Sequence, residues 1–299
     1  MKHGKINWPL FSLAVPGLVF LLAFYYAPLF GLIIPFKRMN YAKGIWGSDW
    51  IGFKNFEFFF KSQDAFRVTR NTLGLNFSFI IITLVLAVLL ALLLFELSGR
   101  KVKIYQTAMF MPYFISWIVA SYILYALLNP LMGVLPHLLK SLGMESPNFY
   151  NTPRPWSFIL VTAYVWKNAG YMTLLFYASL MGIDSTQFEA AAIDGANKPQ
   201  IVFHISIPFL VPVITLLAIL QIGKIFYSDF GMFYFLTRDS GALYSATDVV
   251  DTYVYRALRI TGDIGMASAA GLYQSAVGFL LVLGSNLMVR RISRESAIF

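Results

Sequence analysis

The stretch NTLGLNFSFIIITLVLAVLLALLLF, residues 71–95, decides the fold class. It contains no charged residue, and it exceeds the roughly 20 apolar residues that a helix needs to cross the hydrocarbon core of a bilayer. The alternation of apolar and polar residues expected of a barrel strand is absent. We therefore predict a transmembrane α-helix over 71–95, because a segment without water must satisfy its backbone hydrogen bonds internally.

The rest of the chain repeats this pattern. The sequence has 299 residues, 58% of them hydrophobic and only 12% charged, a composition typical of membrane proteins rather than of soluble domains. Five further windows have the length and character of a span: 9–36, 105–128, 156–181, 206–228 and 265–289. We predict an all-α membrane protein with six transmembrane helices and one domain over 1–299. Prolines such as Pro112 and Pro212 are expected to be tolerated as kinks.

The distribution of Lys and Arg along the chain indicates on which side of the membrane the termini lie. Six spans place both termini on one side, and Lys and Arg are roughly twice as dense in the segments predicted for that side as in those opposite, which favours cytoplasmic termini. On the opposite side, IGFKNFEFFFKSQDAFRV, residues 51–68, has apolar residues at helical spacing. This segment is predicted to form a helix that lies along the membrane interface.

Acidic residues are missing from all six windows, with Glu96 at a boundary. Intramembrane carboxylates usually carry proton coupling, so their absence argues against a proton-driven carrier, although unwound backbone can bind sodium without them. The chain also lacks the G-x-x-x-x-G-K-[ST] loop that holds nucleotide phosphates. Energy for active transport would therefore have to come from another subunit that grips a cytoplasmic loop.

Several other activities are not expected. The formal charge of +9 is scattered between apolar runs, which indicates lipid headgroups rather than nucleic acid as partners. His3, His137 and His204 lie far apart and have no second ligand at metal spacing. We predict no metal site, no bound cofactor and no catalytic residue in this chain.

Residues 182–205 separate the fourth and fifth windows and include EAAAIDGA, residues 189–196. The Ala run favours a helix, and Asp194-Gly195 is a turn signal at which Gly can adopt the left-handed conformation that ends a helix. Asn197 and Pro199 are typical of the start of a second helix. Two short helices that meet at a glycine would form a rigid knob, and we expect Phe203 and Ile205 to anchor its second helix on the membrane domain.

The order and spacing of residues in this loop resemble a known motif. They resemble the cytoplasmic loop of permease subunits of binding-protein-dependent ATP-binding-cassette (ABC) importers. The positions that carry the resemblance are Glu189, Ala190, Ala191, Asp194, Gly195, Ala196, Phe203, Ile207, Pro208 and Pro212. The segments GFKNFEFFF, NTLGLN, MFMPYFIS and TDVVDTYVYRALRITGDIGMASAAGLYQSAVGF are similar to carbohydrate-uptake permeases, in particular to the branch associated with complex oligosaccharides and polysaccharide fragments.

The resemblance implies a type I importer permease fold in the bacterial cytoplasmic membrane. It implies as partners a second permease, which we expect to be a different chain, two ATPase subunits that bind ATP and Mg²⁺, and an extracellular solute-binding protein. Glu189, Asp194 and Gly195 would be the key positions at which the loop docks on an ATPase. The alternatives are a loop that is merely a capped helix between spans, a carrier or channel working alone, and a membrane enzyme or sensor.

Two polar stripes are candidates for a sugar path, since hydrogen-bonding groups and aromatic rings recognise sugars. One is in the fourth window, at Tyr164, Lys167, Asn168 and Tyr171, and the other in the fifth, at Gln221, Lys224 and Ser228. Lys167 could instead bond a neighbouring helix, and Lys224 could extend to the interface. If both lysines face the path, an anionic sugar such as a uronate is favoured.

Two weaker expectations concern the ends of the spans. Aromatic residues near window ends are predicted to be interface anchors: Tyr113, Trp117 and Trp156. The charged outer loop 229–264 could receive the binding protein, or it could simply be solvated.

Overall fold

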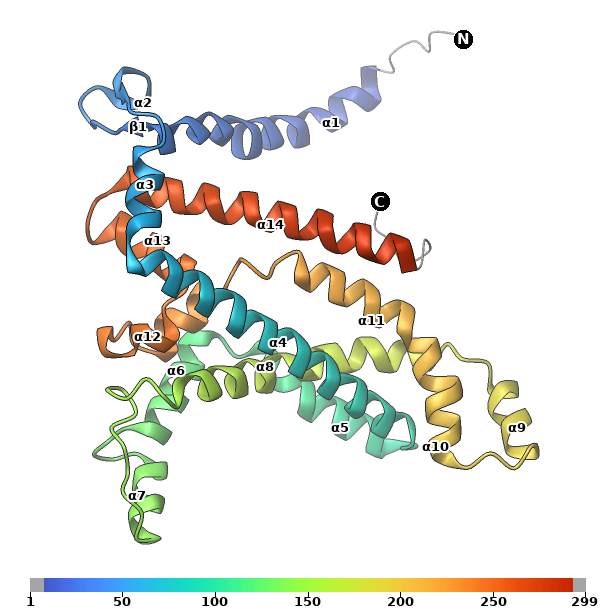
Figure 1. Cartoon of the computed structure of the whole chain (residues 1–299). Coiled ribbons are helices and arrows are strands. Elements are labelled where there is room, and N and C mark those ends of the chain that lie inside the picture. The colour runs from blue at the N-terminus through green and yellow to red at the C-terminus, as the bar shows by residue number, and fades with distance from the viewer. Residues whose placement is uncertain (1–7, 293–299) are drawn as a thin grey trace. The chain divides into compact units, whose positions relative to one another are not determined.

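The computed structural model describes residues 8–292, whose regular secondary structure is helical apart from one short hairpin. These residues form two compact units. The first unit comprises the described residues up to Gln63 together with Val254–Tyr273, and the second comprises Asp64–Tyr253 and the described residues from Gln274 onward. Figure 1 labels the helices and strands of both units.

The first unit begins with a long apolar helix that changes its hydrogen-bond pattern along its length. It runs as α1 (Trp8–Leu21), a π-helical turn η1 (Leu22–Tyr26) and a 3₁₀ segment η2 (Ala27–Phe36). A hairpin follows, in which Lys37 pairs with Trp50 and Arg38 with Asp49. The remaining elements of this unit are β1 (Lys37–Arg38), α2 (Gly44–Gly47), β2 (Asp49–Trp50), α3 (Lys54–Lys61), part of α13 (Val250–Arg259) and the start of α14 (Ile264–Ile292).

The second unit contains the other helices, including most of the long α4 (Gln63–Phe95). The others are α5 (Arg100–Phe110), η3 (Met111–Phe114), α6 (Trp117–Leu128), α7 (Val134–Ser141), α8 (Trp156–Leu180), α9 (Ser185–Ile193), α10 (Lys198–Ile201), η4 (Val202–Ser206), α11 (Ile207–Ile222), η5 (Met232–Leu236), η6 (Gly241–Leu243) and α12 (Tyr244–Thr247).

Four of the described helices are long and apolar enough to cross a membrane, or five if one bent pair is counted as a span. They are Phe11–Phe36, Gln63–Phe95, Lys198–Ile222 and Ile264–Leu287. The helix α8 has 25 residues and covers the fourth predicted window, but polar residues such as Lys167 and Asn168 make it less apolar than these four. The segment 51–68 is helical as predicted, in α3 and the start of α4.

The prediction of a single third span over 105–128 is wrong in its geometry. The chain breaks at Ile115 and Ser116, and the helices on either side, Arg100–Phe114 and Trp117–Leu128, are bent by 98°. Pro112 cannot donate a backbone hydrogen bond, and the Ser116 hydroxyl caps the new helix by accepting from the Val119 N–H at 3.3 Å. What was expected to be a tolerable kink is therefore a complete change of direction.

The fifth window, predicted over 206–228, ends early. The helix stops at Ile222, and turns and extended chain occupy the positions that follow Gly223. The helical run also begins earlier than predicted, at Lys198, because it continues through the π-helical turn η4 into α11.

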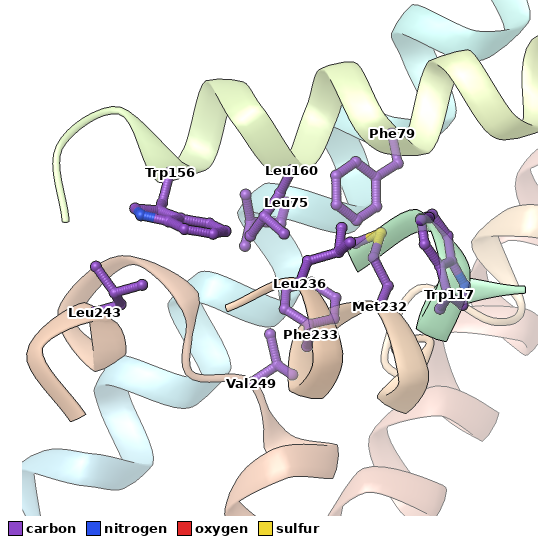
Figure 2. Close-up of a cluster of buried hydrophobic side chains, with 11 residues drawn as sticks. Leu75, Phe79, Trp117, Trp156, Leu160, Met232, Phe233, Leu236, Leu243 and Val249 are labelled. Atoms are coloured by element: carbon purple, nitrogen blue, oxygen red, sulfur yellow. The ribbon is translucent and has the colours of Figure 1, made fainter. Parts of the chain in front are cut away.

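A cluster of buried apolar side chains holds the second unit together at one end (Figure 2). Leu75 and Phe79 of α4 meet Trp156 and Leu160 of α8, and the remaining members come from α6, η5 and the chain that follows η5. The other members are Trp117, Ala120, Met232, Phe233, Leu236, Leu243 and Val249. A second apolar cluster lies further along α4 and α8. Its buried members include Ala87 of α4 and Phe176 of α8.

The predicted role of two tryptophans as interface anchors is wrong. Trp156 is fully buried, and its indole N–H donates to the carbonyl oxygen of Phe149. Trp117 is only 8% exposed, and its indole N–H donates to a carboxylate oxygen of Asp229. A tryptophan near the end of a predicted span can lie at the lipid interface or in the protein core, and its position in the sequence does not distinguish the two.

Candidate functional site

The loop 182–205 forms the two-helix knob that its sequence predicts. Its first helix, α9, is capped by Asp184, whose carboxylate accepts from the N–H of Thr186 at 3.0 Å. Hydrogen bonds from Thr186 lower the pKa of the Asp184 carboxyl below its usual value, because they stabilise the ionised form. The cap therefore carries a negative charge at neutral pH, at the positive end of the helix dipole.

The end of α9 is a Schellman motif centred on Gly195, which has φ = +76°. The N–H of Ala196 donates to the carbonyl of Ala191 at 2.9 Å, and the N–H of Gly195 donates to that of Ala192 at 3.1 Å. A Cβ at Gly195 would meet no atom within 4 Å, so only the left-handed backbone favours glycine here.

A capping box starts the second helix two residues later. The Asn197 side chain accepts from the N–H of Gln200 at 3.0 Å, and the Gln200 side chain accepts from the N–H of Asn197 at 2.8 Å. Pro199 occupies the first turn, where its missing N–H costs nothing. The predicted turn and second helix are confirmed.

Three contacts fix the knob to the membrane-spanning helices. The Phe188 ring packs against Phe95 with centroids 5.6 Å apart, Ile205 packs on the second apolar cluster, and Lys198 forms an ion pair with Glu96. The prediction that Phe203 is an anchor is wrong, because its side chain is 66% exposed. The π-helical turn Val202–Ser206 adds a residue to the helical register and turns Ile205, rather than Phe203, inward.

The outer surface of the knob is exposed and partly apolar. Glu189 and Asp194 are exposed, no residue of α9 is buried, and the Ile193 side chain at the tip is 87% exposed. A hollow of about 320 Å³ separates the two helices, with Ala191, Gly195 and His204 among its lining residues. Ile193 is thus a single exposed apolar side chain at the tip of a preformed knob.

Lys167 of α8 forms hydrogen bonds to backbone carbonyls at the break between η3 and α6. Its ammonium donates to the carbonyl oxygens of Tyr113, at 2.7 Å, and Ile115. It also lies 5.6 Å and 5.4 Å from the ring centroids of Tyr113 and Trp117, and Asp229 acts on it electrostatically. The lysine thus satisfies carbonyls that the broken helix leaves without partners, which is the second of the two roles open to it from the sequence.

The other predicted residues of α8 lie beside this lysine. Tyr164 stacks on Phe79 with ring centroids 4.4 Å apart, and Tyr171 stacks on Tyr113 at 4.8 Å and is 38% exposed. The Asn168 side chain donates to the carbonyl of Tyr164, one turn earlier in the same helix. These residues share a face as predicted, and Tyr171 is the most open of them.

The second predicted stripe is not a helical face. Gln221 belongs to α11, and its side chain acts electrostatically on Tyr164, so the two candidate groups lie close to each other. Lys224 and Ser228 follow the end of the helix, so the predicted helical spacing does not hold. Lys224 is exposed, whereas Ser228 is buried and donates its N–H to Asp251 at 2.8 Å.

Two residues of this site were missed at the sequence level. Asn76 is buried in α4, where its amide donates to the Ile225 carbonyl at 2.8 Å and the Ser228 hydroxyl at 3.1 Å, and so holds the chain after α11. An amide inside an otherwise apolar window is a signal that could have identified it. Asp229 was placed in the charged outer loop 229–264, which could receive the binding protein or simply be solvated, and only the fold brings it to Trp117.

The backbones of α5 and α8 approach closely at Gly170. A Cβ on this glycine would lie 1.8 Å from the carbonyl oxygen of Met109, so only glycine allows the helices to cross at this distance. The close crossing sets the position of Lys167, one turn earlier in α8, relative to the break after η3.

The sequence of this part of the chain matches a known family. Residues 102–294 match the family described as binding-protein-dependent transport system inner membrane component, and the chain belongs to it. The match includes the loop 182–205 and the polar face of α8.

Curated relatives extend over nearly the whole chain. Protein LplB of Bacillus subtilis is 34% identical over 296 residues, 99% of this chain and 92% of its own length. The polygalacturonan/rhamnogalacturonan transport system permease protein YteP of the same species is 31% identical over 96% of this chain and 89% of its own length. The sn-glycerol-3-phosphate transport system permease protein UgpA of Escherichia coli O157:H7 is 29% identical over 95% and 93%.

Solved structures agree with this assignment. The chain is similar to one in a bacterial ABC transporter involved in the import of the acidic polysaccharide alginate, with a TM-score of 0.87 and 31% identity over 96% of both chains. A second crystal structure, of a bacterial alginate ABC transporter in complex with an alginate pentasaccharide-bound periplasmic protein, matches with a TM-score of 0.87 and 30% identity. The fold is therefore the type I permease fold, and the relatives YteP and UgpA are named as permease proteins of transport systems.

Proposed function

We propose that this chain is a permease subunit of an ATP-driven importer in the bacterial cytoplasmic membrane, and that it forms part of the path for an acidic oligosaccharide. The observation that carries the proposal is the rigid knob 182–205 with its exposed tip at Ile193, on a family member that lacks a nucleotide-binding loop of its own. Such a chain needs a partner that hydrolyses ATP, and the knob offers that partner a preformed surface.

The substrate class rests on the relatives. The name of the relative YteP includes polygalacturonan and rhamnogalacturonan, and that of UgpA includes the anion sn-glycerol-3-phosphate. The structural neighbour is described as an importer of the acidic polysaccharide alginate. The exposed Lys224 is the residue of the candidate path that has charge to offer a carboxylate. Tyr171, with its partly open ring, supplies a stacking surface for a sugar face.

We assign Lys167 and Ser228 to positioning rather than to sugar contact, because their polar atoms are already bonded within the chain. Asn168, Tyr164 and Gln221 form a polar strip between α8 and α11 that would line the path beside Tyr171.

In this proposal the membrane is crossed six times, with both termini in the cytoplasm. The four apolar helices, the bent pair α5–α6 and the polar α8 supply the six crossings. The polarity of α8 fits a helix that faces a path between subunits rather than lipid. The loop 182–205 then lies on the cytoplasmic side with the termini.

The partners would be a second permease, two ATPase subunits that bind ATP and Mg²⁺, and an extracellular solute-binding protein. The structural neighbour solved with a periplasmic protein supports the last of these. Glu189, Asp194 and Gly195 would dock in the ATPase together with Ala190, Ala191, Ala196 and Ile193. Closure of the ATPases would then move the knob as a rigid body, while Pro208 begins the helix that transmits the movement.

The test is reconstitution of this chain with its partners in liposomes. We expect uptake of a uronate oligosaccharide that requires ATP and the binding protein, with weaker uptake of a neutral oligosaccharide of the same length. Uptake by this chain alone, without ATP, would support a solitary carrier or channel instead. Gly195→Asp should leave the protein in the membrane but abolish coupled uptake, and normal uptake by this variant would contradict the docking role.

A further inference from the structure

A hollow of about 440 Å³ lies within the first unit. Its lining residues come from three segments: the strand β1 with the residues directly after it, the start of α3 with Ile51, and the start of α14 with the two residues before it. Figure 1 labels β1, α3 and α14. Three basic residues line it, Lys37, Arg38 and Lys54, against one acidic residue, Asp263.

The wall is held by specific bonds. The Asn55 amide donates to the carbonyls of Pro35, at 2.7 Å, and Lys37, at 3.1 Å, which ties α3 to the end of the first helix. Gly265 lies against the same amide, since a Cβ there would come within 2.7 Å of the Asn55 nitrogen. The shape of the hollow is therefore fixed by the fold.

The charges in the hollow are not equally available. The buried Lys37 ammonium donates to the carbonyls of Ile45, at 2.8 Å, and Trp46, at 3.0 Å, and so serves the hairpin. Asp263 caps α14 by accepting from the N–H of Met266 at 2.9 Å. Arg38 and Lys54 are exposed, and neither forms an ion pair within residues 8–292. Lys54 also acts electrostatically on Glu57, which itself forms an ion pair with Lys61. Arg38 and Lys54 are therefore the two exposed cations of the hollow.

The position of the hollow along the chain indicates its depth in the membrane. Phe36 is the last residue of one apolar span, Phe11–Phe36, and Ile264 is the first of another, Ile264–Leu287. A site where two spans end lies in the headgroup region. Trp46 and Trp50 of the adjoining hairpin are 72% and 64% exposed, as expected of aromatic residues at this level.

We propose that this hollow binds the phosphate of an anionic phospholipid through Arg38 and Lys54. A guanidinium and an ammonium directed at one anion give the charge-assisted hydrogen bonds that phosphate prefers. A free phosphate offers the same chemistry, but the apolar span Phe11–Phe36, of which none of the most apolar window is buried, provides a surface for acyl chains directly beside the site. The proposal does not depend on the identity of the transported solute.

The test uses the complete importer, purified in detergent, stripped of lipid and titrated during native mass spectrometry. The probes are phosphatidylglycerol, phosphatidylcholine and inorganic phosphate. We expect retained phosphatidylglycerol on the wild type and an affinity lower by about tenfold or more in the double variant Arg38→Gln/Lys54→Gln. Because both side chains are exposed, the melting temperature of this variant should stay within about 2 °C of the wild type.

The matched control is Lys43→Gln/Lys61→Gln, which removes the same charge from the same region but from residues that do not line the hollow. Its lipid binding should change by less than about twofold. Arg38→Lys should retain most of the binding, since it keeps the charge. Equal phosphatidylglycerol binding by the wild type and the double variant would overturn the proposal. So would displacement of the lipid by an equal concentration of inorganic phosphate, or loss of binding-protein docking without any change in lipid binding.

Discussion

The loop 182–205 and the polar face of α8 are built in opposite ways. The hydrogen bonds that shape the loop join residues two to five positions apart, from the Asp184 cap to the bond between Ala196 and Ala191. Lys167 instead bonds carbonyls 52 and 54 positions away, at the break between η3 and α6. Hydrogen bonds between residues close in the sequence can be predicted from the sequence. The bonds of Lys167 cannot, because no neighbouring residue indicates which distant carbonyls the ammonium will meet.

The largest effect on stability should follow from a substitution that prevents the close approach of α5 and α8, which brings Lys167 to its hydrogen-bond partners. Gly170→Ala places a Cβ 1.8 Å from the Met109 carbonyl and forces α5 and α8 apart. We expect a loss of about 3 kcal/mol or more, seen as failure to accumulate in the membrane or as a large fall in melting temperature. Gly74→Ala is the control, since its Cβ would have open space. Equal stability of the two variants would contradict the close crossing.

A smaller effect should separate the two lysines. Lys167→Met leaves the carbonyls of Tyr113 and Ile115 without a donor, and a loss of about 1–3 kcal/mol is expected. Lys224→Met should leave the melting temperature unchanged, because Lys224 is exposed, but should raise the KM for an acidic oligosaccharide relative to a neutral one. Thermal unfolding and uptake assays on both variants make the measurement. A stable Lys167→Met protein with altered substrate choice would reverse the roles assigned here.

The anchor of the knob can be tested with two phenylalanines. Phe188→Ala removes the packing on Phe95 and should cost about 1–2 kcal/mol. Phe203→Ala should have no measurable effect on the stability of the purified chain, because this ring is 66% exposed. Melting temperatures of the two variants decide the matter, and a larger loss for Phe203→Ala would show that the register after the π-helical turn has been assigned wrongly.

An effect on stability similar to that of Phe188→Ala is expected at Gly195, where docking of the ATPase is the main property to measure. Gly195→Val forces a β-branched residue to φ = +76°, which costs about 1–2 kcal/mol within the turn. Gly195→Asn keeps the backbone accessible, because asparagine tolerates the left-handed region. Both proteins should reach the membrane, and co-purification of ATPase subunits should fall for the valine variant more than for the asparagine variant. Equal co-purification would mean that the backbone of the turn does not matter for docking.

Several features of the site were predictable because they depend on contiguous residues. The glycine turn, the second helix at Asn197 and the shared face of Tyr164, Lys167 and Tyr171 follow from local signals of this kind. The break after Pro112, the exposure of Phe203 and the burial of Trp156 did not follow, since each depends on which neighbour happens to be opposite.

The sequence by itself determined that this is a helical membrane protein, the approximate position of its apolar spans, and the capped, glycine-centred turn of its surface loop. Hydropathy, helix caps and left-handed glycines act within one segment, so they can be identified without knowledge of the fold. The tertiary structure alone decided that the third predicted span breaks by 98°, that Lys167 of α8 closes this break, and that Asn76 and Asp229 belong to the same site. A buried polar group must find a partner, and only helix packing determines which segment supplies it.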